Sequence, residues 1–204
     1  MTIRPLTLDD ISDLRAYERE RDEFRRAVIA EKKLRRVSVG PVVTLTFESR
    51  TTVRFQVQEM ARAERLTTDA QVQQELDVYN RLLPARGELS ATLFLELTSE
   101  EQLRTWLPRL VGIEHSAALL LGEGTGARSV RSVPEVDHLS QLTRDDVTSA
   151  VHYVRFPFAS PEVETFVSGP VTLVVDHPGY PEGLPGVLLP EATREALAAD
   201  LTAP

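Results

Sequence analysis

Imidazole and carboxylate groups are the side chains in this sequence that suit metal chemistry. His152 lies within a strand-like run, and Asp176 and His177 stand at the end of another. Glu59 and Glu75 lie on two consecutive segments of helical pattern. Because imidazole and carboxylate together suit iron, zinc or manganese, these five residues form a candidate site for a divalent or iron-type metal. The structural alternatives are a core histidine at position 152 and a turn residue at position 177.

Polar residues beside the same helical stripes predict a ligand-binding site. Gln56 and Glu59 are one turn apart on the first predicted helix, and Glu75 and Tyr79 are one turn apart on the second, with Asn80 following. These side chains border the apolar stripes, so they can converge on a pocket. A solvated helix surface is the alternative, because glutamate is almost never buried without a partner.

Acid–base chemistry without a metal is a further hypothesis. It needs a base, a carboxylate partner and an anion anchor. The candidates for these roles are, in turn, His152 or His177, Glu48 or Glu59, and Arg50 or Arg155. Glu48 and Arg50 also fit a simple ion pair that holds a strand–helix corner.

Several familiar signatures are missing. A di-iron helix bundle needs Glu-x-x-His motifs in pairs on packed helices. Residues 47–84 contain no histidine, and Glu135–His138 matches the motif once, in a stretch without helical period. The run GEGTGA at 122–127 lacks the Lys-Ser/Thr that a phosphate loop requires. No Gly-x-Ser-x-Gly nucleophile elbow is present.

Composition limits the function classes. The chain has 204 residues and no cysteine, which excludes disulfides and an iron–sulfur cluster ligated by this chain. A net charge of −8 opposes nucleic-acid binding, because phosphate contacts need basic surface. No apolar run approaches the length of a membrane span, and the N-terminus lacks the apolar core of a signal peptide. We therefore expect a cytoplasmic protein.

The elements that must position these residues form an α+β pattern, which we expect to fold as a single domain over residues 1–204. Five runs read as strands of one antiparallel or mixed sheet: 42–48, 88–97, 117–121, 150–156 and 171–176. Alternation in the run 150–156 places His152 on the face of Val154 and Phe156, which predicts the core face. Residues 122–148 are the least patterned stretch and predict an irregular connection, to which Val130 and Val133 can add a short strand.

The predicted helices lie in the first half of the chain. A charged helix is expected from about 16 to 35, within a helical N-terminal segment 1–36, and it lies outside the sheet or reaches a second subunit. A central pair spans 47–84, with Thr51 or Thr52 capping the first helix and Thr68 or Asp69 capping the second. This tightly joined pair is expected to cover the sheet. A homodimer is one arrangement that would use the charged helix.

The sequence resembles an uncharacterised bacterial family, domain of unknown function 3501. The resemblance rests on six blocks that cover most of the chain: FRRAVIAEKKLRR, LTFESRTTVRFQVQEMARAERL, ELDVYNRLLP, GELSAT, SAVHYVRFPF and VVDHPGY. The family brings no catalytic residue to transfer. Its association with rubrerythrin-like and iron–sulfur oxidoreductase-like proteins implies an accessory or binding role in a redox- or metal-related pathway, with a redox protein as partner. A metal-dependent enzyme or metal-binding protein is the alternative.

Overall fold

Two antiparallel sheets and several helices make up the chain in a computed structural model, which describes residues 4–124, 127–135, 146–181 and 184–202. The α+β class is therefore confirmed. The prediction of one sheet is wrong, because the five expected strands divide between two sheets. Alternation identifies a half-buried strand, but it does not name the strand's neighbour.

The first sheet contains the strand that carries His152 and the strand that Glu48 directly follows. Its order is β1 (Arg36–Val39), β2 (Val43–Phe47), β3 (Glu88–Leu95), β7 (Val151–Pro157) and β6 (Val133–Pro134). The hairpin between β1 and β2 turns at Gly40, as expected, and this glycine has a φ of +67°. The Tyr180 hydroxyl closes the turn by donating to the Val39 carbonyl at 2.5 Å and accepting from the Val42 and Val43 amides.

The second sheet contains the strand that precedes Asp176. Its order is β5 (Arg128–Arg131), β4 (Ala117–Leu121), β8 (Val171–Val175) and β9 (Val187–Leu188). Buried side chains from both sheets form one hydrophobic core, to which Leu45 and Phe156 contribute from the first sheet and Leu119 and Leu173 from the second.

The segment 122–148, predicted as an irregular connection, contains the short strands β5 and β6 in its described part. Residues 136–138 of the Glu-x-x-His match lie outside the described residues.

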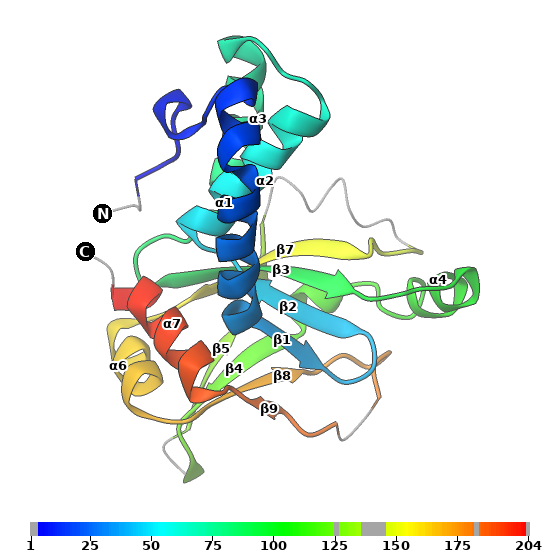
Figure 1. Cartoon of the computed structure of the whole chain (residues 1–204). Helices are drawn as coiled ribbons and strands as arrows, with labels where there is room; N and C mark the ends of the chain where they lie inside the picture. Colours follow the sequence, from blue (N-terminus) through cyan, green and yellow to red (C-terminus); the bar gives the residue numbers. More distant parts are fainter. Residues whose placement is uncertain (1–3, 125–126, 136–145, 182–183, 203–204) are drawn as a thin grey trace.

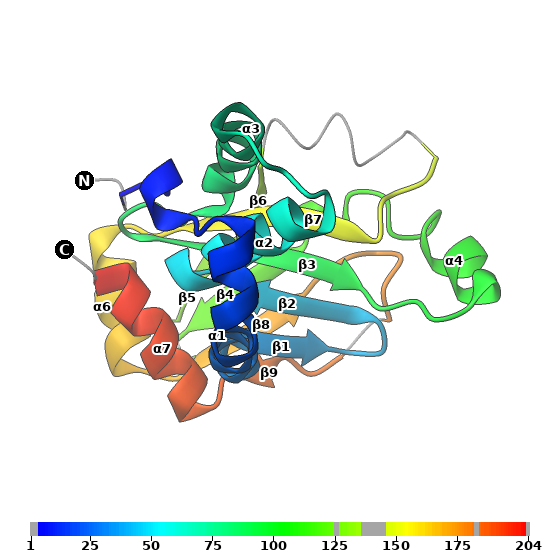
Figure 2. The same cartoon turned by 45° about the horizontal axis from the view of Figure 1, so that its top comes forward.

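Further helices close the ends of the sheets. α6 (Ser160–Ser168) and α7 (Glu191–Thr202) lie together at one end, and α4 (Glu100–Trp106) lies at the other (Figures 1 and 2). Ser99 caps α4 by accepting from the Gln102 amide. A short helical turn, η3 (Ile113–His115), leads into β4.

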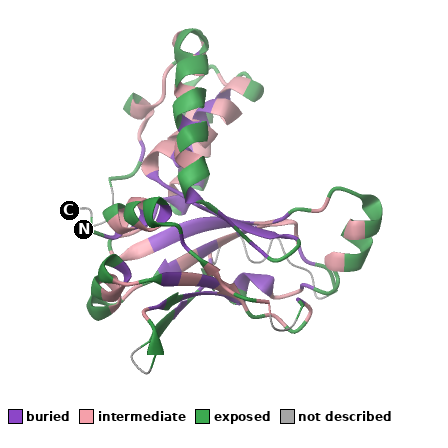
Figure 3. Cartoon of the chain, turned by 60° about the horizontal axis from the view of Figure 1, so that its bottom comes forward, coloured by how far each residue is buried: buried purple, intermediate pink, exposed green. Residues whose placement is uncertain are grey.

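The remaining helices form a part of the molecule that projects beyond the sheets (Figure 1). We call η1 (Leu8–Asp10), α1 (Leu14–Arg35), α2 (Arg50–Ala63) and α3 (Asp69–Tyr79) the helical arm; it rises from the sheets, and the outer surface of α1 is exposed (Figures 1 and 3). A second hydrophobic cluster packs α2, α3 and the N-terminal segment of the arm together. It consists of Leu6, Val53, Val57, Leu76, Tyr79, Leu82 and Leu83.

The arm corrects two details of the helix prediction. Ser49 rather than Thr51 or Thr52 caps α2, because Thr52 is occupied as the return partner of the same capping box. The pair α2–α3 does not lie flat on the sheet: α1 and α7 contact β2 and β3, whereas α2 and α3 reach the sheet through Tyr153 of β7. Thr68 caps α3 as predicted.

Candidate functional site

Glu59 joins α2 to α1. Its two carboxylate oxygens accept from the Nε and Nη2 of Arg21, both at 2.8 Å, and one of them also accepts from the Tyr17 hydroxyl at 2.7 Å. The Arg21 hydrogen bond is the main cause of a lowered Glu59 pKa, and burial raises the pKa of the fully buried Tyr17 phenol. Glu59 is thereby engaged within the helical arm.

Three of the predicted ligand-binding residues do converge. Gln56 of α2 hydrogen-bonds the Tyr79 hydroxyl of α3, and the Glu75 charge acts on the same phenol. Burial raises the pKa of Tyr79 and, with the nearby Glu64 charge, that of Glu75. Tyr153 lies close enough for Tyr79 to contribute to its raised pKa. This polar cluster lies where the helical arm meets β7.

Two amide side chains tie the N-terminal segment to the helical arm. Asn80 donates to the Leu6 carbonyl at 2.9 Å and accepts from the Leu6 amide at 2.8 Å. Gln58, which sequence reasoning missed, holds the backbone of Ser12 in the same two-bond way, at 2.8 and 2.9 Å. Gln58 is fully buried, and a buried amide needs hydrogen-bond partners. Its position beside Val57 and one turn before Ala61 in the apolar stripe could have indicated this burial from the sequence.

The three remaining acid–base candidates take separate partners. The buried Glu48 carboxylate accepts from Thr52 at 2.5 Å and Thr92 at 2.6 Å. Arg50 instead pairs with Asp10 at 2.9 Å. The alternative of a Glu48–Arg50 ion pair at the corner is therefore wrong, because each group has another partner. Arg155 pairs with Glu88 and donates to the backbone of residues 81 and 83.

His152 is buried, as the strand alternation predicts, and it meets an acid that the sequence analysis did not name. Its Nδ1 lies 3.6 Å from the Glu114 carboxylate, and both side chains are nearly inaccessible. Its Nε2 lies 2.9 Å from the Ser149 carbonyl and 3.0 Å from the Thr148 hydroxyl. A carbonyl can only accept, so Nε2 carries the hydrogen. Burial lowers the His152 pKa, and the Glu114 charge opposes this shift.

The neighbouring side chains of Asp176 and His177 have different partners. The Gly179 amide donates to Nδ1 of His177 at 3.0 Å, so Nε2 donates to the Val111 carbonyl at 3.0 Å. Asp176 forms an exposed ion pair with Arg131. The five proposed metal ligands thus lie in five different surroundings. In the described ranges no group of three or more histidine, aspartate and glutamate side chains is placed to hold a metal ion, and the metal site stays a prediction.

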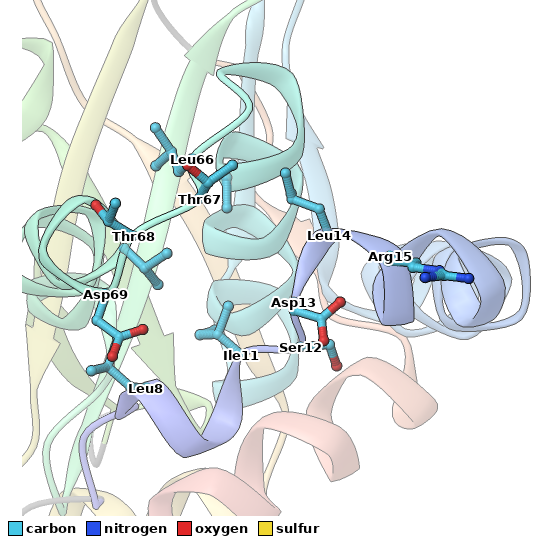
Figure 4. Close-up of a pocket in the computed structure, with 12 residues that line it drawn as sticks. Leu8, Ile11, Ser12, Asp13, Leu14, Arg15, Leu66, Thr67, Thr68 and Asp69 are labelled. Carbon is cyan, nitrogen blue, oxygen red and sulfur yellow. The ribbon is translucent and has the colours of Figure 1, made fainter.

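An open groove lies at the end of the helical arm, between the N-terminal segment and the α2–α3 turn (Figure 4). It encloses about 340 Å³. Its apolar lining residues are Leu8, Ile11, Leu14, Ala61, Leu66 and Val72. Its polar lining residues are Ser12, Asp13, Arg15, Thr67, Thr68 and Asp69. Most of the polar residues are exposed, so the groove opens to solvent with its apolar surface inside.

The fold and its groove define a two-sheet α+β protein with a projecting helical arm. The chain belongs to the family described as protein of unknown function (DUF3501), whose model matches residues 5–201. A solved structure, a novel protein of unknown function from Burkholderia pseudomallei K96243, is similar to it at 36% sequence identity and a TM-score of 0.87. The likeness covers 97% of this chain and 100% of that chain. No curated protein matches the sequence. Among the described helices, none is long and apolar enough to cross a membrane.

Proposed function

We propose that this chain is an accessory protein that binds a partner protein through its helical arm. The observation that carries the proposal is the arm itself, which stands out from the sheets on its own hydrophobic cluster and ends in an open groove. A separate small core that supports an exposed groove favours a binding role over a purely structural one, because ordering each residue of the arm loses conformational entropy.

The contacts of the candidate catalytic residues also favour binding over catalysis. Glu59 holds two helices together, and Glu48 is enclosed by two threonine hydroxyls. His177 has both ring nitrogens bonded to backbone groups. A general base needs a proton within hydrogen-bond reach on a substrate. The hydrogen-bonding atoms of these three side chains instead bond to other groups of the protein.

The resemblance supplies the class of partner to test first. The family's association with rubrerythrin-like and iron–sulfur oxidoreductase-like proteins supports the proposal of a redox protein as partner, in a redox- or metal-related pathway of the cytoplasm. A second copy of the chain is a further partner, which light scattering on the purified protein tests directly.

Quantitative affinity capture from the native host tests the proposal. The baits are the full chain, an arm variant carrying Leu66→Asp and Val78→Asp, and a control variant, Leu188→Asp, whose exposed leucine lies on β9. We expect the wild type and the control to recover the same partner, and the arm variant to lose most of it. No reproducible partner, or equal recovery by all three baits, contradicts the proposal. Iron analysis and the visible spectrum of the captured complex test the redox assignment separately.

A further inference from the structure

We infer that the groove of the helical arm binds a segment of the partner protein in which an apolar side chain is flanked by lysine or arginine. This inference rests on the proposed function and specifies the chemistry of its partner. It follows from three properties of the groove: its size and apolar lining, the fixed position of its walls, and the charge at its mouth.

The size and lining favour a side-chain anchor. Leu8 and Ile11 lie on the side of the N-terminal segment, and Leu66 lies on the side of the α2–α3 turn (Figure 4). Ala61 of α2 and Val72 of α3 complete the apolar lining. About 340 Å³ is at the lower end of the roughly 300–1,000 Å³ of small-molecule sites. An open hollow of that size suits one or two aliphatic side chains of a docked segment, in the way that amphipathic segments anchor in apolar grooves.

The walls are held in place before any partner arrives. Gln58 fixes the Ser12 backbone, and Arg54 donates to the Asp10 carbonyl at 2.7 Å. Arg50 pairs with the Asp10 side chain at 2.9 Å. On the other wall, Thr68 caps α3. A groove built this way loses little further entropy on binding, which favours affinity from a small contact area.

The mouth of the groove carries exposed acids on both walls. Asp13 lies at the start of α1 and Asp69 at the start of α3. Helix α3 contains no lysine or arginine from Asp69 to Tyr79. Arg15 also lines the groove, but its side chain extends away from Asp69 (Figure 4). Complementary charge therefore requires a basic segment.

A labelled peptide of leucine and lysine in helical repeat is the probe, and fluorescence anisotropy with the full chain is the measurement. The acid variant is Asp13→Ser with Asp69→Ser, in which serine keeps the cap of α1. Its control is Asp22→Ser with Asp77→Ser, which removes one exposed acid from each of the same two helices outside the groove. The apolar variant is Leu66→Gln, and its control is Val78→Gln on the exposed side of α3. Thermal melts establish that all four variants fold.

We expect the acid variant to bind the probe roughly threefold to tenfold more weakly than wild type, and the loss to shrink as salt is added. The Leu66→Gln variant should also weaken binding, and both controls should match wild type. Equal losses in variants and controls overturn the inference, because they show binding to the general acidic field. Equal binding of a matched leucine and glutamate peptide overturns it as well.

The two proposals fail separately. If host capture depends on the arm but the groove variants bind the probe normally, the groove inference is wrong and partner binding through the arm stands. If host capture recovers no partner, the proposed function is wrong, whatever the peptide does.

Discussion

His152 of β7 and Glu114 of η3 face each other across the seam between the two sheets, with Nδ1 and Oε2 3.6 Å apart and both side chains buried. The same imidazole holds the Ser149 carbonyl through Nε2. Glu114 leads into a strand of the second sheet and His152 lies in the first, so the two side chains meet where the sheets approach each other, and among the described residues the buried Oε2 of Glu114 has no hydrogen-bond partner there.

Stability should therefore fall as the pH is lowered. The pKa of His152 in the folded state lies below its ordinary value of 6.5, so the unfolded state takes up the proton first and folding stability is lost as pH falls below that value. We expect His152→Gln to cost about 1–2 kcal/mol at about pH 7, because the buried Ser149 carbonyl loses its bond from the ring, and to flatten the pH dependence. Urea unfolding at several pH values measures both effects. His115→Gln, beside Glu114 but exposed, is the control, and an unchanged slope in the His152 variant contradicts the prediction.

The joint between α1 and α2 predicts a second stability effect. Glu59→Gln loses the charge that Arg21 engages through two hydrogen bonds and that the buried Tyr17 hydroxyl also contacts. We expect a loss of about 1 kcal/mol in unfolding free energy, since the ion pair is partly exposed. Asp22→Asn on the exposed side of α1 should change stability little. Equal effects of the two substitutions would show that the joint adds nothing to stability.

The turn at His177 predicts a third effect, because Gly179 has no room for a side chain. A Cβ there would lie 1.9 Å from the Arg109 carbonyl oxygen, so Gly179→Ala must displace backbone. We expect a loss of more than about 3 kcal/mol. Gly112→Ala meets no neighbouring atom within 4 Å and should cost about 1 kcal/mol, for its positive φ alone. Thermal melts that rank the two variants in the opposite order rule out this interpretation.

Asp10 and Arg50 predict a titration. The hydrogen bond from Arg50 is the largest cause that lowers the Asp10 pKa from 3.8 to about 2. A lowered pKa means that this contact stabilises the fold above pH 3.8 and is lost as pH falls toward 2. NMR titration of the Asp10 carboxyl should show the low value in wild type and a return toward 3.8 in Arg50→Met. An unshifted wild-type value would mean that the ion pair is not populated in solution.

Local sequence rules predicted many of the helices, strands and caps of this structure. They did not predict which strands and side chains from distant parts of the sequence meet. The cap at Thr68 and the inward face of His152 follow from a few neighbouring residues, and both are confirmed. The division into two sheets depends on which strands meet, and the alternation of side chains carries no such information. Arg21 was hidden within a run of charges, although it is the main partner of Glu59. Glu114 is an acid in a short segment between apolar residues, and a carboxylate buried there needs a partner.

The Tyr180 hydroxyl has a consequence for how the chain is made. Its bonds to Val42 and Val43 span 138 and 137 positions of sequence, yet they close a turn whose strands are only a few residues apart. On the ribosome, the first hairpin emerges long before the phenol that seals it. Until Tyr180 is made, the β1–β2 hairpin lacks the hydrogen bonds that close its turn. A protein truncated before Tyr180 should therefore leave that hairpin accessible to proteases and chaperones.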